Sequence, residues 1–542
     1  MPAVPDATST SAPSRTTEPT FELTSLTWER IQVIVRLRPV SGGPFDPRDV
    51  RLRSVDAPDV AVAPTRGWME GDELVARFNV MQGPGRRPLP PGHWVLTIDG
   101  AAPVRLSSPG SLDPAAQAAR FTFQRGEYRV VPTLVGQGAG LGFDVIMEWS
   151  VGARPPTSRA QGFRRRLVRR PVRRLVKLFA AAFYRALRIA APRGRALLIP
   201  YDRQAPSGSL LHVHERMLQR GLGRRLLVYR TPAGAGWIRR RLNELWMLGR
   251  ADTIVIDKDH ILLRRLRLDV PVIQLWHASA AFKAVGHSRI GTSGGRSPWS
   301  PAHRACTHAI ASGEHDVALW AEAFGLPEER VLPTGIPRMD RFFDPAVREG
   351  GREAVWRAFP HARGRMVILF APTFRGRVSE GTYDLGQLDF AVLHPLCVEK
   401  DAVFIIRLHP MVQHGVDIPE AFRDRILDGT GRMKGEAPDL LFATDLLITD
   451  YSSIMFDYAT QGRPMLFFAP DLDAYRERRG LAVDYEDYVP GRIVRTFDEM
   501  VDAIRRDDYQ AERLAPFIER HFAHLDGGST DRVIDLILSP PR

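Results

Sequence analysis

The sequence predicts an α/β protein with two doubly wound parallel sheets, preceded by a small all-β domain and a basic helix. From Arg195 onward, short apolar runs alternate with helical segments over short loops, a pattern typical of parallel sheets. A second series of this kind begins near Arg365. Residues 21–150 instead consist of short alternating segments separated by Gly and Pro, which indicates β structure, with a sandwich as the expected form.

These patterns divide the 542 residues into five expected parts. Residues 1–20 lack the apolar core of a signal peptide and have the composition of a disordered tail. Residues 21–150 form the β-rich domain, for which we expect an accessory role, and residues 151–194 a basic amphipathic helical linker. Residues 195–345 and 346–542 are expected to form an N-terminal and a C-terminal Rossmann-like domain.

The net charge of +13 is concentrated in one segment. Residues 151–200 contain 14 Arg and Lys and no Asp or Glu, so the remainder of the chain is close to neutral. This distribution argues against a nucleic-acid-binding protein that is basic throughout. The two cysteines, Cys306 and Cys397, form neither a disulfide framework nor a zinc pattern, and they fit a reducing compartment.

The basic segment contains a candidate membrane-binding helix between Arg164 and Arg188. Bulky apolar residues recur at helical spacing on one face, and basic residues lie largely off that face, a combination that suits an anionic membrane surface. The alternatives are a helix that bridges two domains and a basic arm for nucleic acid. The residues expected to contact the membrane are Arg173, Arg174, Lys177, Phe179 and Phe183.

The stretch from Asp445 to Phe468 predicts a strand–turn–helix–strand unit. Its first strand is a short apolar run, typical of a strand that is buried on both faces. Ser452 and Ser453 follow the strand, where the N-cap of the next helix is expected. Free N–H groups and the helix dipole make such a turn a phosphate site, whereas the simpler interpretation is that the serines only cap the helix.

Two further strands are followed by basic side chains. Thr373 and Arg375 come after the apolar run 366–370, and Arg407 and His409 come after the run 403–406. Because the carboxyl ends of parallel strands share one edge of a sheet, we expect these residues to lie near the serine turn. Arginine binds phosphate oxygens in a bidentate manner. Each residue alone fits a surface ion pair, but together they predict a polyanionic ligand, a nucleoside diphosphate in particular.

In the other α/β series, His277 follows the predicted strand 272–275. Its ordinary pKa near 6.5 suits proton abstraction from an alcohol at neutral pH. A hydrogen-bonded structural role is the alternative for a single histidine at a strand end. Lys283 lies six residues on, in a sequence that nearly always uses Arg.

Several segments together resemble the CDP-glycerol glycerophosphotransferase family, which includes teichoic-acid primases, polymerases and related CDP-polyol transferases. The segments are QLWHASAAFK, PTGIPRMD, ILFAPTFRG, IIRLHP, DLLITDYSSIMFDYA and AYRERRG with DYEDYVPG. They stand in the family's order between about Arg195 and Phe522. The residues after His277 depart from the family's usual Gly and Thr-Pro-Leu-Lys-like run, so we expect a different acceptor-side loop.

The resemblance implies a two-domain glycosyltransferase-B fold, in which residues 195–345 bind the acceptor and residues 346–542 bind the CDP donor. It implies transfer of glycerol phosphate or ribitol phosphate from CDP-glycerol or CDP-ribitol to a lipid-linked acceptor, with release of CMP. His277 matches the proposed base, and Lys283 the acceptor side. His409, also expected to be catalytic, and Arg407 match an RxHP motif on the donor phosphate. The remaining donor residues are Thr373, Arg375, Asp450, Ser452 and Ser453.

We therefore expect a peripheral enzyme at the cytoplasmic face of the cell membrane, without a cofactor and without a metal site indicated by the sequence. The acceptor is a lipid-linked glycan or polyol phosphate of the cell wall or capsule. Two alternatives stay open. One is a nucleotide-sugar glycosyltransferase of the same fold, and the other is a membrane-surface scaffold with a degenerate cleft.

Overall fold

The chain forms two compact units, Met1–Pro155 with Ser297–Trp299, and Pro156–Arg296 with Ser300–Arg542. Each unit is described separately below. The computed structural model describes residues 20–41, 45–98, 102–123, 126–135, 140–149, 179, 182–190, 194–200, 205–230, 236–260, 263, 268–292, 297–375, 383–409, 412, 415–430, 438–479, 481 and 483–541.

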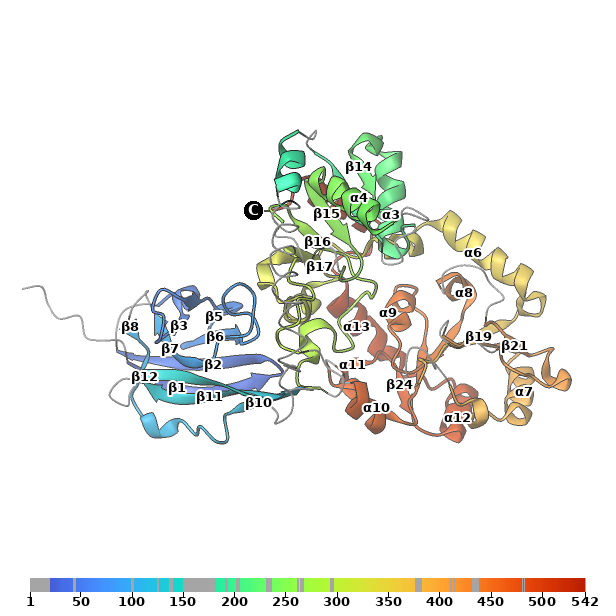
Figure 1. Cartoon of the computed structure of the whole chain (residues 1–542). Coiled ribbons are helices and arrows are strands. Elements are labelled where there is room, and N and C mark those ends of the chain that lie inside the picture. Colours follow the sequence, from blue (N-terminus) through green and yellow to red (C-terminus); the bar gives the residue numbers. More distant parts are fainter. Residues whose placement is uncertain are drawn as a thin grey trace, which may run out of the picture. The chain divides into compact units, whose positions relative to one another are not determined.

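The described strands of the first unit form one twelve-stranded sheet, mostly antiparallel, shown in blue and cyan in Figure 1. The all-β prediction is confirmed, but the sandwich is not, because all strands are joined by hydrogen bonds into one sheet. Strand β12 is the branch point, since it pairs with β7, β9 and β11. The strands are β1 (Thr20–Glu29), β2 (Gln32–Ser41), β3 (Arg51–Ser54), β4 (Ala61–Val62), β5 (Arg66–Glu70), β6 (Glu73–Asn79), β7 (Gly92–Ile98), β8 (Ala102–Pro103), β9 (Arg105–Leu106), β10 (Ala119–Phe123), β11 (Gly126–Val135) and β12 (Gly140–Trp149).

The second unit contains two six-stranded parallel sheets, as predicted. The first sheet has the order β14-β13-β15-β16-β17-β18 and the second has the order β21-β20-β19-β22-β23-β24. The first comprises β13 (Ala196–Ile199), β14 (Leu226–Val228), β15 (Thr253–Ile256), β16 (Val272–Gln274), β17 (His308–Ile310) and β18 (Val331–Leu332). The second comprises β19 (Met366–Phe370), β20 (Ala402–Ile406), β21 (Ile426–Asp428), β22 (Leu446–Thr449), β23 (Met465–Phe468) and β24 (Arg492–Val494).

Central strands of both sheets are buried along their whole length and mostly apolar because helices cover both faces of a doubly wound sheet. Every residue of β13, β15, β22 and β23 is buried. Figure 1 shows α3 and α4 beside the first sheet, and α7 and α12 beside the second. The helices are α3 (Gly208–Gln219), α4 (Trp237–Gly249), α5 (Val317–Phe324), α6 (Pro345–Ala358), α7 (Phe390–Glu399), α8 (Pro438–Ala443), α9 (Ile454–Ala459), α10 (Leu472–Arg479), α11 (Tyr485–Tyr488), α12 (Phe497–Arg506), α13 (Leu514–His521) and α14 (Ser529–Leu538).

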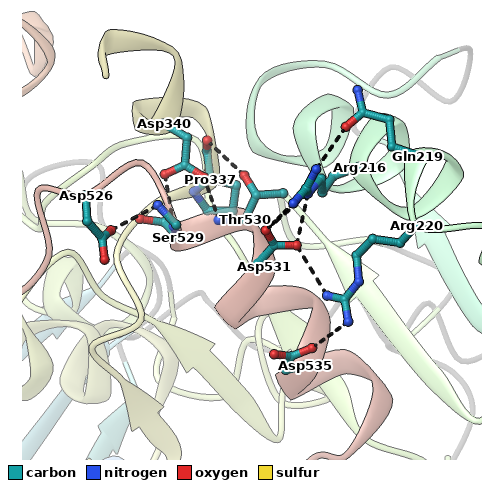
Figure 2. A network of polar contacts seen from close by, with 11 residues as sticks. Arg216, Gln219, Arg220, Pro337, Asp340, Asp526, Ser529, Thr530, Asp531 and Asp535 are labelled. Carbon is teal, nitrogen blue, oxygen red and sulfur yellow. Dashed lines mark hydrogen bonds and ion pairs between the residues drawn. The ribbon is translucent and has the colours of Figure 1, made fainter. Parts of the chain in front are cut away.

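The last helix corrects the expected domain boundary. We placed all of 346–542 with the second sheet, but α14 returns to the first and packs on α3. Asp340, in the 3-10 helix η7 (Pro337–Phe342), accepts hydrogen bonds from the backbone N–H groups of Ser529 (3.0 Å) and Thr530 (2.6 Å) at the start of α14 (Figure 2). Arg216 on α3 pairs with Asp531 at 2.7 Å. These partners are 189 or more residues apart, so local spacing gives no sign of them.

The predicted basic helix is described only at its end, as residue 179 and helical residues 182–190. Tyr184 is buried and donates to Asp269 at 2.6 Å, and Arg188 pairs with Asp252 at 2.8 Å. Residues 182–190 therefore pack on the half of this unit that contains β13–β18, here called the first half. Across the described ranges, no helix combines the length and hydropathy that a membrane span requires.

Candidate functional site

A cavity of about 410 Å³ lies in the second unit, between its first half, which contains β13–β18, and its second half, which contains β19–β24. Each half contributes residues that follow its parallel strands, at the edge of the sheet where we expected a ligand to bind. Five predicted residues line this cavity together: His277, Arg407, His409, Ser452 and Ser453. The other lining residues are Ser207, Gly208, Ser209, Asp257, Trp276, Arg338, Ala371, Pro372, Leu408, Ile454 and Asp457.

A strained turn at the end of β16 positions His277. The preceding Trp276 has φ +57°, a left-handed conformation that costs a bulky residue about 1–3 kcal/mol. Its ring packs against Trp320 and Phe324, at centroid distances of 6.1 and 5.4 Å. This packing holds the turn that brings the neighbouring His277 to the cavity wall.

The electrostatics of His277 keep its ring neutral. Burial, together with the positive charges of Lys258 and Arg338, lowers its pKa to about 4. A hydrogen bond with the main chain of Asp257 acts in the opposite direction and fixes one ring nitrogen. The imidazole is therefore neutral at pH 7, and its exposed surface opens on the cavity. A neutral ring with one nitrogen held keeps the other as a proton acceptor.

On the opposite side, Arg407, Leu408 and His409 directly follow β20 and line the cavity. The Leu408 N–H donates to the Thr430 hydroxyl at 3.1 Å, and the Arg407 guanidinium donates to the Gly429 carbonyl at 3.4 Å. The His409 ring lies 4.8 Å from that of Phe374. Burial, and then the charge of Lys283, lowers the pKa of His409.

Lys283 does not line the cavity. It forms a β-bridge with Leu481, and its ammonium group lies 5.8 Å from the Tyr475 ring centroid. Both partners belong to the second half, and the charge of Lys283 acts on His409. The structure therefore places Lys283 next to the half for which we expected donor binding, although the motif put it on the acceptor side.

Ser452 and Ser453 stand between β22 and α9, as predicted. The Ser452 hydroxyl accepts a hydrogen bond from the Ile454 N–H at 3.4 Å, while Ser453 makes no side-chain capping bond. Helix α9 has only six residues. The contribution of this turn is therefore two hydroxyl groups on the cavity wall rather than the dipole of a long helix.

The other three donor residues lie outside the cavity lining. Arg375 pairs with Asp450 at 2.9 Å and with Asp471 at 2.7 Å, and it lies over the Tyr451 ring at 5.1 Å. Although burial opposes it, the two carboxylates raise the pKa of Arg375. Asp450 also accepts a hydrogen bond from the Thr373 N–H at 2.7 Å. These contacts tie the ends of β19 and β22 together, and the charge of Arg375 is neutralised within the protein.

The sequence argument missed a clamp between the two halves. Arg338 donates to Asp457 at 2.8 Å and to Ser279 at 2.9 Å, and the Ser279 hydroxyl donates to Asp457 at 2.8 Å. Ser279 follows β16, Asp457 lies on α9, and Arg338 lies on the η7 connector. Nothing in the local sequence marks Asp457 as the partner of Arg338.

Residues that follow parallel strands lie at the edge of the sheet where ligands bind, which is how His277 was identified. The same argument applies to Asp257 and to the turn 207–209, which our sequence argument did not include. Asp257 directly follows β15, and Ser207, Gly208 and Ser209 begin the helix after β13. All four line the cavity from the first half.

Of the expected membrane residues, Arg173, Arg174 and Lys177 lie outside the described ranges. Phe179 is 64% exposed, and its ring stacks on that of Phe183 at 6.1 Å. Leu187, a third described residue of the predicted apolar face, instead lies against Gly249 at the end of α4.

Comparison with known proteins places this arrangement in a family. The family described as CDP-glycerol:poly(glycerophosphate) glycerophosphotransferase matches residues 199–539, more than half of the chain. The teichoic acid ribitol-phosphate polymerase TarL of Staphylococcus aureus is 37% identical over 66% of this chain and 65% of its own. TarK of the same organism, also a teichoic acid ribitol-phosphate polymerase, is 41% identical over 53% of this chain and 56% of its own. The aligned part is thus less than two thirds of either relative.

Two other aligned proteins are covered over almost their whole length. The teichoic acid ribitol-phosphate primase of Bacillus spizizenii is 30% identical over 68% of this chain and 97% of its own. Among solved structures, the wall teichoic acid polymerase TagF superposes with a TM-score of 0.55 at 20% identity, covering 68% of this chain and 96% of that one. At that identity the likeness concerns the fold, and it agrees with the predicted glycosyltransferase-B architecture. The chain belongs to the CDP-glycerol:poly(glycerophosphate) glycerophosphotransferase family.

Proposed function

We propose that this protein transfers a polyol phosphate from a CDP-polyol to a hydroxyl group of a lipid-linked cell-wall or capsular acceptor, with release of CMP. The observation that carries the proposal is the shared cavity. A neutral histidine lines it from one half, and an arginine, a histidine and two serines line it from the other. This arrangement brings a base and an anion-binding wall to the same 410 Å³ space.

The donor diphosphate rests on the second half. Arg407 supplies the positive charge, while His409, Ser452 and Ser453 supply hydrogen bonds to its oxygens. Arg375, Thr373 and Asp450 support this wall indirectly by fixing the ends of β19 and β22. Their substitution is expected to lower stability together with donor affinity.

His277 then accepts the proton of the acceptor hydroxyl at the ring nitrogen not engaged with the Asp257 main chain. The hydroxyl oxygen attacks the β-phosphorus, and a new phosphorus–oxygen bond forms. The bond from that phosphorus to the oxygen bridging the two phosphates breaks, and CMP leaves with this oxygen. Arg407 stabilises the charge that builds up on the phosphoryl oxygens.

The comparisons favour ribitol over glycerol in the donor. The relatives that share 37% and 41% identity are named for ribitol phosphate. A teichoic acid glycerol-phosphate primase of Bacillus subtilis shares 26%. CDP-ribitol is therefore the first donor to test, with CDP-glycerol beside it.

Substitution of His277 by alanine tests the mechanism. A general base contributes roughly 10²–10⁴-fold, so CMP release should fall by that factor while CDP-polyol still binds. His394→Ala is the matched control, because His394 pairs with Asp424 at 2.8 Å and does not line the cavity. Full turnover of the His277 variant would remove this residue from the chemistry.

Two measurements separate the alternatives. Mass spectrometry of the product distinguishes a phosphodiester from the glycosidic bond that a nucleotide-sugar glycosyltransferase would make. A thermal-shift assay with CDP-ribitol and CDP-glycerol tests the degenerate scaffold, which neither nucleotide should stabilise.

Attachment to the cytoplasmic face of the membrane is part of the proposal. The 14 basic residues of 151–200 and the exposed Phe179 support it. Phe179→Ala should weaken sedimentation with vesicles that contain anionic lipid. Phe422→Ala, a partly buried phenylalanine beside His394, is the control. Equal binding by the wild type to neutral and anionic vesicles would contradict an electrostatic attachment.

A further inference from the structure

A second cavity, of about 240 Å³, lies at the amino edge of the second sheet. Arg365 and Val367 line it from the start of β19. Asp445 directly precedes β22, and Arg463 lies two residues before β23. Because β22 and β19 have four and five residues, this edge is separated from the carboxyl edge by roughly 13–17 Å. The cavity is therefore distinct from the one between the two halves. Its remaining lining residues are Arg352, Trp356, Gly364 and Ala443.

Positive charge predominates in this lining. Three arginines stand against one carboxylate, that of Asp445, which leaves an excess of two positive charges. Both oxygens of Asp445 are engaged, one with the Val367 N–H at 2.9 Å and the other with Arg463 at 3.0 Å. Arg365 lies 3.4 Å from Asp401, outside the lining, but that carboxylate is 69% exposed and is shared with another arginine. The cavity therefore suits a dianion.

A structural role accounts for only part of these arginines. The Arg352 Nε donates to the Phe442 carbonyl at 3.1 Å, and the Arg463 Nη1 donates to the Thr444 carbonyl, both at the C-terminal end of α8, where cations are favourable. Each of these bonds uses one nitrogen of a guanidinium group. Among the described residues, the two terminal nitrogens of Arg352 and the Nε and Nη2 of Arg463 have no hydrogen-bond partner. The side chains of Arg365 and Arg463 are 31% and 26% exposed, so an anion from solvent reaches them.

The size of the cavity and the geometry of arginine favour a phosphate group. Sites for drug-sized ligands measure roughly 300–1,000 Å³, so a cavity of 240 Å³ favours a single phosphate group over a whole nucleotide. The planar guanidinium fork matches the spacing of phosphate oxygens. A phosphate monoester carries about −1.5 to −2 charges at neutral pH, which nearly balances the excess in the lining.

We propose that the cavity lined by Arg352, Arg365 and Arg463 is a second anion site, which binds one phosphate group. The phosphate is either inorganic phosphate or the phosphomonoester headgroup of a lipid. Its oxygens accept hydrogen bonds from the terminal nitrogens of Arg352 and from Arg463. This site goes beyond the proposed function and does not depend on it, because none of its residues takes part in the transfer.

Gly364 provides a test that leaves the arginines in place. It lines the cavity with φ +78°, and a Cβ added there has no other atom within 4 Å. Asn and Asp tolerate positive φ better than other residues with a side chain, so Gly364→Asp and Gly364→Asn differ mainly in one negative charge. We would titrate the full chain with inorganic phosphate at constant ionic strength in a calorimeter. Gly364→Asn should bind within about twofold of the wild type, and Gly364→Asp roughly tenfold more weakly.

Substitution of an arginine locates the phosphate. Arg352→Gln should weaken phosphate binding roughly tenfold, the value of one hydrogen bond between charged groups. Arg348→Gln is the matched control, because Arg348 lies one turn earlier on α6, is exposed and does not line the cavity. Arg407→Ala should leave the affinity within about twofold of the wild type. A loss in Arg407→Ala without a loss in Arg352→Gln would assign the phosphate to the other cavity and overturn the inference.

Vesicles distinguish the two sources of the phosphate. Vesicles of phosphatidylcholine with and without phosphatidic acid would be sedimented with the two Gly364 variants. If the lipid headgroup is the ligand, Gly364→Asp should bind the phosphatidic acid vesicles more weakly than Gly364→Asn. If free phosphate is the ligand, the two variants should sediment equally and differ only in the calorimeter. Identical behaviour of both variants in both assays would overturn the inference.

Discussion

Loss of Arg338 should destabilise the unit that carries both parallel sheets. Its guanidinium lies 2.8 Å from an Asp457 carboxylate that is only 7% exposed, and Arg338 is itself 16% exposed. Arg338→Met keeps the chain length and removes the cation, which leaves a buried carboxylate without its ionic partner. Removal of one member of a buried pair costs about 3–5 kcal/mol. We expect a value near the lower end, about 3 kcal/mol, because Arg338 reaches the cavity solvent.

The pairing is best measured by a double-mutant cycle with Asp457→Leu. If the cost of each single substitution comes from the charge left behind, Arg338→Met with Asp457→Leu should lose much less than the sum. We expect a coupling of about 2 kcal/mol. Unfolding in urea, followed by circular dichroism, gives the free energies. In a thermal scan, a loss of about 3 kcal/mol corresponds to a shift of roughly 4 °C for a unit of this size.

A surface pair provides the control for this cycle. Arg363 and Glu353 are 2.7 Å apart, but their side chains are 57% and 40% exposed. Arg363→Met should therefore change the free energy of unfolding by less than about 1 kcal/mol. Strictly additive losses at Arg338 and Asp457, or a loss at Arg338 no larger than this control, would refute the clamp.

Three further predictions concern His277, Arg407 and the start of α14. The lowered pKa of His277 should place the acid limb of the pH profile of kcat/KM near pH 4. Because the unfolded chain binds the proton more tightly than the folded one, protonation of His277 should also lower the free energy of unfolding as the pH falls from about 6.5 to about 4. A limb near 6.5 that persists in His409→Ala would contradict this assignment. Arg407→Ala should raise the KM for the CDP-polyol by roughly 10–100-fold and leave the acceptor KM near its wild-type value, as steady-state kinetics would show. Asp340→Ala should loosen the start of α14 at a cost of about 1 kcal/mol, seen as faster hydrogen exchange at the Ser529 and Thr530 amides, and unchanged protection there would argue against the cap.

Local sequence patterns are enough to predict the parallel sheets and the residues at their strand ends. Each strand is a short apolar run, and the residue after it must emerge at the same edge as its neighbours, so His409 and Ser453 could be assigned to one sheet edge by local reasoning. His277 follows a strand of the other sheet, and only the family resemblance predicted a cleft that it shares with them. The chemical capacity of these side chains, proton transfer for histidine and hydrogen bonding for serine, follows from the residue type. The same rule, applied consistently, reaches Asp257 and Ser209.

The tertiary structure was needed to show which of the strand-end arginines reach the cavity. Arg375 and Arg407 both follow buried strands, yet Arg375 is paired with Asp450 and Asp471, whereas Arg407 lines the cavity. The return of α14 to α3 and the contact of Arg338 with Asp457 are likewise decided by partners 119 or more residues away. A local pattern specifies which face a side chain occupies, but an ion pair forms only where folding brings the opposite charge within about 4 Å, and no spacing along the chain encodes that distance.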